Sequence, residues 1–279
     1  MKQNLKRMIL VFCTLASLLF QPAMASLVIA VYSNDQIYLA SDSLSVMSGY
    51  ETNKESHLNS KKIFKVSSNC CASITGAFGA EFVNVSSNQK FGLDLPGALG
   101  HACDDACKTT NNLEERINNI IGQFSDNHSQ FIRLECYAGK RTNGVEGTRV
   151  CFWGYDTAKD RFFGSSYLFD WTNDVVASQA FDSKHIDRYY IGIQGEDNFL
   201  PSVIINNGAN IKLRSAGFSK TLQDLNSTNS VSDQQMVSLI IEMFQLHKKY
   251  ACQLSSDKGW IDEPYLIFKI TKNSVVELN

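Results

Sequence analysis

The sequence predicts an α+β protein in which two antiparallel sheets pack face to face between two layers of helices, a four-layer αββα sandwich. Two observations carry this prediction. Short apolar or aromatic runs separated by turn residues recur in three parts of the chain, and two groups of segments with helical periodicity lie between them. This order is typical of antiparallel sheets covered by helices. Other α+β arrangements fit the same order, so the sandwich is a hypothesis at this point.

The first 25 residues have the pattern of a secretory signal peptide. Three basic residues precede an apolar run at 8–20, and Ala23-Met24-Ala25 supplies the small residues of a cleavage site. We therefore expect a signal peptidase to cut before Ser26 and to leave residues 26–279 as one periplasmic or secreted domain. The apolar run has 13 residues, whereas a membrane span needs about 20, so we expect no stable span after cleavage.

Composition and charge exclude one class of function. The formal net charge of −2 becomes −5 when the three basic residues of the leader are removed, because the leader has no acidic residue. A mildly acidic chain without Lys/Arg clusters lacks the basic surface that binds nucleic acid. The hydrophobic content of 44% suits one sizeable core, and no linker or low-complexity segment divides the chain.

Two hairpins are expected at the start of the mature chain. Apolar runs at 27–32 and 37–40 flank a short turn, and a second pair of runs follows at 62–66 and 70–74. The polar, glycine-containing stretch 45–60 between the hairpins is expected to be a loop.

Helices and further strands follow. Pro96 suits the first turn of a helix, and an apolar face with helical spacing starts at Leu113, where Asn111 or Asn112 can cap it. A capping-box pattern precedes a late amphipathic helix at Ser232. Short aromatic and β-branched runs predict strands at 131–137, 150–153, 161–163, 167–169 and 265–270.

The cysteines predict a disulfide. Eight are present, and Cys13 is lost with the leader, so an oxidising compartment would leave an odd number to pair. Cys136 with Cys151 is the preferred pair, since each lies in a strand-like run and Asn143-Gly144 between them is a hairpin turn signal.

Metal and cofactor sites are not expected. His101, Cys103 and Cys107 lack the second half of a zinc-ligand set, and burial or disulfide bonding explains these cysteines better. The five histidines show no zinc-hydrolase spacing, and Gly192 and Gly195 do not form a nucleotide-binding fingerprint.

A serine released at a chain terminus can act as a nucleophile with its own base. The free α-amino group has an ordinary pKa of about 7.7–8.0, and a nearby lysine ammonium would lower it further. A carboxylate can hold the lysine, and backbone N–H groups at a glycine turn can bind the oxyanion. Ser26, Asp42, Lys62 and Gly76 supply these four parts in order. Lys61 is a rival for the role of Lys62.

The spacing of these residues carries a family resemblance. The sequence SLVIAVYSNDQIYLASDS from Ser26 resembles the start of a mature proteasome β-type subunit, TTxxGxxxxDGxxLAxDxR. Asp42 lies sixteen residues after Ser26, as the catalytic Asp does in that family. Lys62 begins KIFKV, which is similar to the family's KIxxI strand, and Gly76 follows fourteen residues later, at the family's oxyanion position.

The resemblance implies an N-terminal nucleophile (Ntn) hydrolase of αββα fold that cleaves amide bonds in peptides or small amides. Ser26 would be the nucleophile and its α-amine the base, Lys62 would lower the pKa of the amine, Asp42 would orient Lys62, and the Gly76 N–H would bind the oxyanion. Such subunits usually form rings, so the resemblance also implies a homo-oligomer. Thr is the usual nucleophile of this branch, and Ser and Cys occur in the wider superfamily.

Two features depart from the family pattern. The supporting Ser of its glycine loop has no match between Gly192 and Gly195. The counterpart of its late RDxxSG segment stays open among four residues: Ser255, Ser256, Asp257 and Asp262. A non-catalytic envelope protein that keeps the scaffold for assembly or binding is the alternative function.

Overall fold

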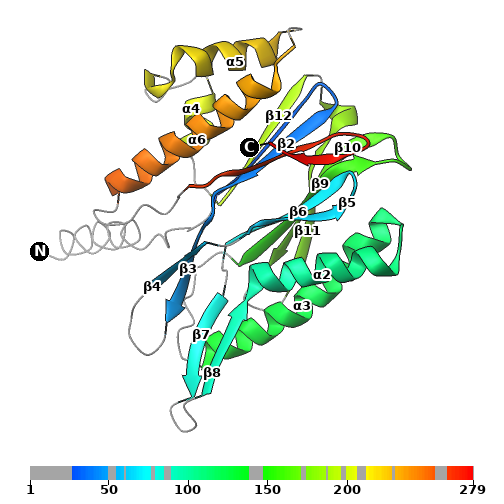
Figure 1. Cartoon of the computed structure of the whole chain (residues 1–279), viewed down its shortest axis with the longest axis vertical. Coiled ribbons are helices and arrows are strands. Elements are labelled where there is room, and N and C mark those ends of the chain that lie inside the picture. The colour runs from blue at the N-terminus through cyan, green and yellow to red at the C-terminus, as the bar shows by residue number, and fades with distance from the viewer. Residues whose placement is uncertain are drawn as a thin grey trace, which may run out of the picture.

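The computed structural model describes most of the chain after residue 26: residues 27–49, 55–59, 61–76, 79–84, 89–137, 147–170, 174–186, 188–195, 199–205, 212–227, 230–254 and 263–278. Within these ranges the protein is α+β, with two five-stranded antiparallel sheets, a smaller four-stranded sheet and five α-helices. Figure 1 shows two groups of helices on opposite sides of the sheets.

The first sheet has the strand order β12-β1-β2-β13-β14, and all its strand pairs are antiparallel. The β1–β2 hairpin closes through Asn34 and Asp35, which both have positive φ, as a two-residue turn between twisted strands requires. Its strands are β1 (Val28–Ser33), β2 (Gln36–Ser41), β12 (Tyr189–Gln194), β13 (Leu266–Ile270) and β14 (Val275–Glu277).

The second sheet has the order β11-β10-β9-β6-β5 and is also antiparallel throughout. Its strands are β5 (Ile63–Ser67), β6 (Cys70–Thr75), β9 (Thr148–Asp156), β10 (Arg161–Phe169) and β11 (Val175–Asp182), and a 3-10 turn, η1 (Ser183–His185), follows β11.

The third sheet has the order β4-β3-β7-β8 and lies beside the two larger sheets at the lower left of Figure 1. Its central pair, β3 with β7, is parallel, and its outer pairs are antiparallel. Its strands are β3 (Leu44–Gly49), β4 (Glu55–Asn59), β7 (Gly79–Asn84) and β8 (Gln89–Asp94). The loop predicted at 45–60 is therefore wrong in part, because most of β3 and all of β4 lie there and pair with each other.

Caps define where the helices begin. Asn112 Oδ1 accepts a hydrogen bond from Glu115 N at 3.1 Å, and Ser232 and Gln235 form the reciprocal capping box that the sequence predicts. The helices are α2 (Leu95–Thr109), α3 (Leu113–Tyr137), α4 (Phe199–Ile204), α5 (Ala216–Asn226) and α6 (Asp233–Leu254).

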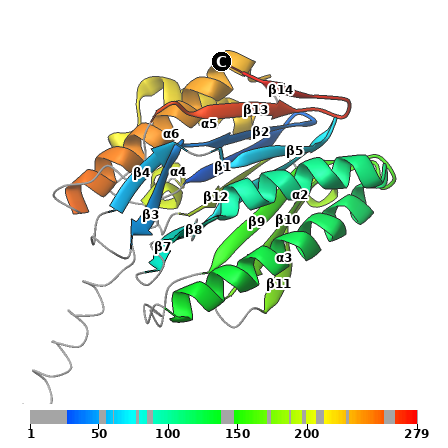
Figure 2. The ribbon, with the colours of Figure 1, turned by 60° about the horizontal axis from the view of Figure 1, so that its bottom comes forward.

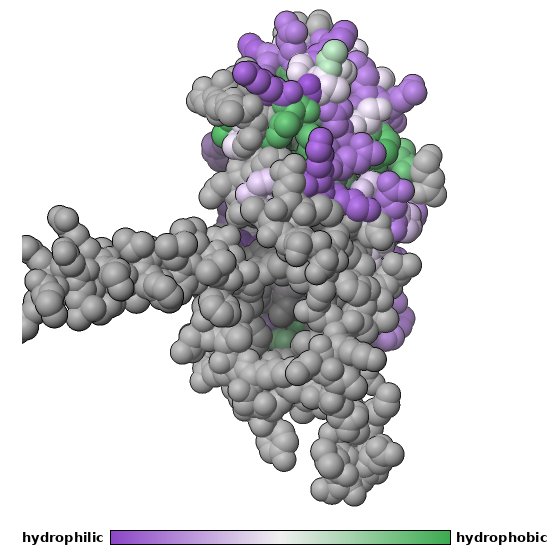
Figure 3. Space-filling view, turned by 90° about the vertical axis from the view of Figure 1, so that its left-hand side faces the viewer, coloured by the Kyte–Doolittle hydropathy of each residue, from purple (hydrophilic) through white to green (hydrophobic). Residues whose placement is uncertain are grey.

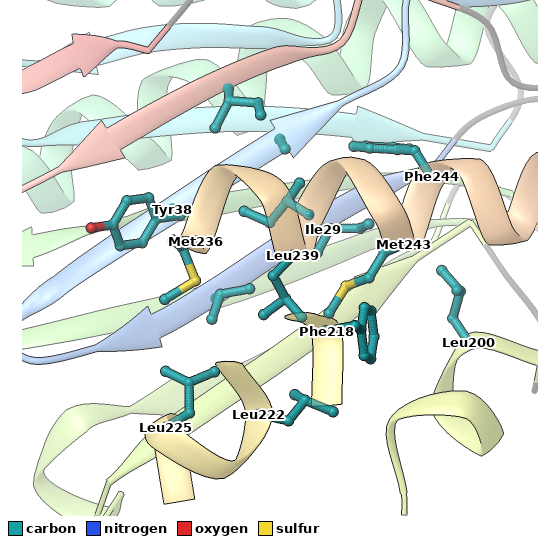
Figure 4. Close-up of a cluster of buried hydrophobic side chains, with 14 of the residues drawn as sticks. Ile29, Tyr38, Leu200, Phe218, Leu222, Leu225, Met236, Leu239, Met243 and Phe244 are labelled. Carbon is teal, nitrogen blue, oxygen red and sulfur yellow. The ribbon is translucent and has the colours of Figure 1, made fainter. Parts of the chain in front are cut away.

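One hydrophobic cluster joins the first sheet to α4, α5 and α6. Figure 4 shows Met236, Leu239 and Met243 of α6 directed toward the strands, with Phe218 and Leu222 of α5 packed beneath that helix. The apolar face of α6 with helical spacing predicts this packing, whereas α5 lies in a segment where no helix is predicted.

A second cluster joins the second sheet to α2 and α3, which run side by side across it in Figure 2. Phe124 and Phe131 of α3 are buried there, and Phe124 packs edge-to-face on Phe169 of β10 at 4.9 Å between ring centroids. The strand predicted at 131–137 is wrong, because α3 continues to Tyr137 and Phe124, His128 and Phe131 lie on one helical face.

A third cluster fills the space between the two five-stranded sheets. Alternate residues of β9, Cys151 and Trp153 among them, face this space, while Val150 and Phe152 face the helices. We call the side of each sheet that faces the other sheet its inner face.

The predicted Cys136–Cys151 disulfide is wrong. Cys151 is a free thiol on the inner face of the second sheet. Position 136 belongs to α3, which packs against the opposite face of that sheet. The sheet itself therefore separates the two positions.

The described helices do not meet what a membrane span requires. Among the described residues, none of the helices combines the length and the apolar character that crossing a membrane requires. Around α5 and α6, at the top of Figure 3, the described surface is mainly hydrophilic with small, separate hydrophobic areas.

Candidate active site

Three of the four predicted site residues lie at the open ends of the two predicted hairpins. Asp42 follows the last residue of β2, Lys62 precedes the first residue of β5, and Gly76 follows the last residue of β6. The fourth, Ser26, lies outside the described residues, as do the four late candidates at 255–262. The site can therefore be described from Leu27 onward.

Asp42 and Lys62 form a buried ion pair that connects the two large sheets. Lys62 Nζ lies 2.9 Å from Asp42 Oδ1, and both side chains are 0% exposed. The rival residue, Lys61, is exposed, and its Nζ lies 5.6 Å from the centre of the Phe64 ring. The structure therefore assigns the contact with Asp42 to Lys62.

The backbone of Leu27 is held by the same carboxylate. Leu27 N donates to Asp42 Oδ1 at 2.8 Å, and Asp42 N donates to Leu27 O at 3.4 Å. Asp42 Oδ1 thus accepts hydrogen bonds from both the ammonium of Lys62 and the start of β1. Sequence spacing does not reveal this backbone contact, because any residue type at position 27 provides an N–H.

Burial lowers the pKa of the Lys62 ammonium below its usual value of 10.5, and the charge of Asp42 opposes part of this decrease. A buried ammonium loses its hydration, which disfavours the charged form. Lys62 therefore releases its proton more readily than a solvent-exposed lysine would, while it stays hydrogen-bonded to a carboxylate.

Gly76 occupies a position that only glycine fits. Its φ is +96°, and a Cβ built on it would lie 2.4 Å from Gly147 O, far inside van der Waals contact. The backbone of Gly147 and Thr148, at the start of β9, therefore packs directly against the turn that follows β6.

A groove lies at the other end of the second sheet, away from Gly76. This groove of about 880 Å³ is bordered by the β5–β6 turn, the first turns of α3 and the β9–β10 turn. Lys159 on its wall forms ion pairs with Glu114 and Asp156 at 3.6 and 3.5 Å. None of the predicted site residues lines this groove.

No cluster of three or more metal-ligating side chains occurs within the described ranges. The chain matches no protein-family model and no curated protein. The arrangement of Asp42, Lys62, Gly76 and Leu27 is therefore the basis for a functional proposal.

Proposed function

We propose that this protein is an extracytoplasmic Ntn hydrolase of the proteasome-like branch, a peptidase or amidohydrolase whose nucleophile is Ser26 after removal of residues 1–25. The observation that carries the proposal is the buried Asp42–Lys62 ion pair with Leu27 N bound to the same carboxylate oxygen. Consecutive Cα atoms are about 3.8 Å apart, so a fixed Leu27 limits how far the preceding residue can be from this pair.

The finer fold assignment, a four-layer αββα sandwich, belongs to the same proposal. It is supported by three hydrophobic clusters, one between the two large sheets and one on the outer side of each. In such a sandwich the ends of β2, β5 and β6 meet where the two sheets are joined, which is the location that the proposed chemistry needs.

In the proposed reaction, Ser26 Oγ attacks the carbonyl carbon of an amide and its proton passes to the free α-amine of Ser26. The carbonyl oxygen becomes an oxyanion, which the Gly76 N–H binds. The tetrahedral intermediate breaks its C–N bond, the α-ammonium protonates the leaving amine, and an acyl-Ser26 ester remains. Water then hydrolyses the ester and regenerates the enzyme.

Lys62 and Asp42 act on the base in this scheme. The positive charge of Lys62 near the α-amine disfavours protonation of that amine and lowers its pKa. Asp42 holds Nζ of Lys62 in place at 2.9 Å. The lowered pKa of Lys62 also allows it to exchange a proton with the amine during the reaction.

Determining the mature N-terminus by mass spectrometry is the first test. The secreted protein should begin at Ser26, because any other start removes the terminal amine that serves as base. Treatment with an epoxyketone, an electrophile directed at N-terminal Ser and Thr, should then label Ser26 in the wild type and in Ser26→Thr.

Ser26→Ala should be secreted and folded but unlabelled, and Ser68→Ala, in the exposed β5–β6 turn, should be labelled like the wild type. A mature chain that begins elsewhere would contradict the proposal. A folded protein that starts at Ser26 and resists labelling would favour the non-catalytic envelope protein instead.

A further inference from the structure

The side chains on the inner face of the second sheet change from aromatic to polar along its strands. Toward the turns between β5 and β6 and between β9 and β10 it is aromatic, with Trp153 and Phe162 buried between the sheets. Toward Gly76 the same face carries polar groups. Alternation along the strands puts these residues on it: Ser73, Thr75, Arg149, Cys151 and Ser166.

Arg149 is the charged member of this polar region. It is directly opposite Thr75 in the β6–β9 register, so it lies one residue away from Gly76. Its Nη1 donates to Ser166 Oγ at 3.3 Å. Among the described residues no carboxylate lies within ion-pair distance of this half-buried guanidinium.

Other partly buried arginines of the chain are better satisfied. Arg161 forms an ion pair with Asp182. Arg116 donates to the carbonyl oxygens of Thr110 and Val66 and to the side chain of Asn111. A guanidinium has five N–H donors, and burying a charge without an anionic partner costs free energy. Arg149 therefore has unused capacity for an anion.

The first sheet presents unsatisfied polar atoms to the same space. Ser41 shares the inner face with Ile37 and Leu39 and is 0% exposed, yet its Oγ has no hydrogen-bond partner among the described residues. Gln194 donates from Nε2 to Cys151 Sγ at 2.7 Å, while its Oε1 has no partner. Buried polar atoms without partners are rare in native proteins and commonly mark a place where a ligand or water binds.

The distance from Lys62 to this region matches an amino-acid-sized substrate. Ile63 is opposite Ser73, and Ser73 is opposite Cys151, so the residues just before β5 and those at the start of β9 lie two strands apart. Two inter-strand spacings amount to about 10 Å. A side chain of three or four carbons on the acyl side of the scissile amide covers about half of this distance, and the long side chain of Arg149 can reach across the remainder.

We propose that Arg149 selects substrates that carry a carboxylate on the acyl side of the scissile amide, with Ser41 Oγ and Gln194 Oε1 as further polar contacts. The carboxylate supplies the anionic partner that Arg149 lacks. Ser41 can donate to a carboxylate oxygen, and Gln194 can accept from a substrate N–H. This inference rests on the proposed function and adds a substrate class to it.

The test compares two tripeptide epoxyketones that differ only in the residue next to the warhead, Glu or Gln. We expect wild-type Ser26 to react at least about 10-fold faster with the Glu probe, because a charge-assisted hydrogen bond is lost with Gln. Arg149→Gln should remove this preference, because the Glu probe then loses its cationic partner and reacts no faster than the Gln probe. Arg149→Lys should keep part of the preference, and Arg188→Gln, at an exposed arginine, should keep all of it.

Failure of the inference can be separated from failure of the proposed function. Equal rates with both probes in the wild type would overturn the role of Arg149 and leave the hydrolase proposal intact. For a readout without turnover, calorimetry on mature Ser26→Ala should show tighter binding of N-acetylglutamate than of N-acetylglutamine, and Arg149→Gln should abolish the difference. Equal binding of the two compounds would overturn the inference even if no probe labels Ser26.

Discussion

The two ends of the second sheet differ in how they hold charge. At the end where β6 stops and β9 begins, Lys62 is fully buried with Asp42, and Arg149 lies half-buried with no carboxylate partner in the described part of the chain. At the opposite end, Lys159 contacts Glu114 beside a groove of about 880 Å³, and these two side chains are 52% and 77% exposed.

This difference shows that burial, rather than the mere presence of an ion pair, distinguishes the two ends of the sheet. Exposed ion pairs contribute about 0–1 kcal/mol and occur on most protein surfaces. Removing two charges from water costs several kcal/mol per ion before pairing offsets it, so a buried pair is a more informative feature. The end of the sheet that holds the buried pair is therefore the better candidate for the site.

The largest expected effect tests this contrast directly. Lys62→Met should lower the free energy of unfolding by about 3–5 kcal/mol, because it leaves Asp42 buried without its counter-charge, and should abolish labelling of Ser26. Lys159→Met at the other end should change stability by less than about 0.5 kcal/mol. Chemical denaturation of the two variants measures both values. Similar losses of unfolding free energy in Lys62→Met and Lys159→Met would contradict the proposed difference between the two ends of the sheet.

The double variant Asp42→Asn with Lys62→Met sharpens the same prediction. It removes both charges and keeps an oxygen that can accept from Leu27 N, so it should recover much of the lost stability but none of the labelling. A double variant no more stable than Lys62→Met would show that the loss comes from packing rather than from the unpaired carboxylate.

Backbone strain at Gly76 gives the next largest effect. Gly76→Ala should destabilise by about 2 kcal/mol or more, because φ is +96° and the new Cβ would lie 2.4 Å from Gly147 O. Gly122→Ala in α3 is the matched control, since no atom lies within 4 Å of its added Cβ. It should stabilise the protein by about 0.5–1 kcal/mol. Thermal unfolding measures the change in stability of each variant. Changes of the same sign in the two variants would contradict this account.

The smallest predicted effect depends on pH. His128 of α3 is 1% exposed and packs on Phe169, the last residue of β10, and burial lowers its pKa to about 4. The unfolded chain, with an ordinary pKa near 6.5, binds more protons between about pH 4 and 6.5, so stability falls as pH decreases through this range. From pH 7 to pH 5 the loss should be about 1–2 kcal/mol.

Urea unfolding of the wild type, His128→Phe and His101→Gln at the two pH values measures this loss. His128→Phe should lose less stability on acidification than the wild type, and the exposed His101→Gln should behave like the wild type. An unchanged pH dependence in His128→Phe would contradict the assignment to His128.

Much of the fold follows from local signals in the sequence. Both hairpins, the capping box at Ser232 and the cap at Asn112 depend on residues within a few positions of one another, and the structure contains all of them. The errors arise where neighbours in space decide. The aromatic run 131–137 has high β-propensity, but packing of Phe131 against the second sheet extends α3 through it.

The candidate site was predictable in part for a similar reason. Fixed spacing led to Asp42, Lys62 and Gly76, and the structure pairs the first two. The spacing does not point to Arg149 or Ser41. Their interest depends on which face of a strand they occupy and on the absence of hydrogen-bond or ion-pair partners among the described residues. Strand alternation in β9 was the available signal for Arg149, but it has meaning only once the β6–β9 register is known.

The contact between Leu27 N and Asp42 has a consequence for the register of β1. If β1 slipped by one residue, its side chains would exchange faces and a different N–H would be offered to the carboxylate that neutralises Lys62. The register of β1 and the neutralisation of Lys62 therefore depend on the same atom, Asp42 Oδ1.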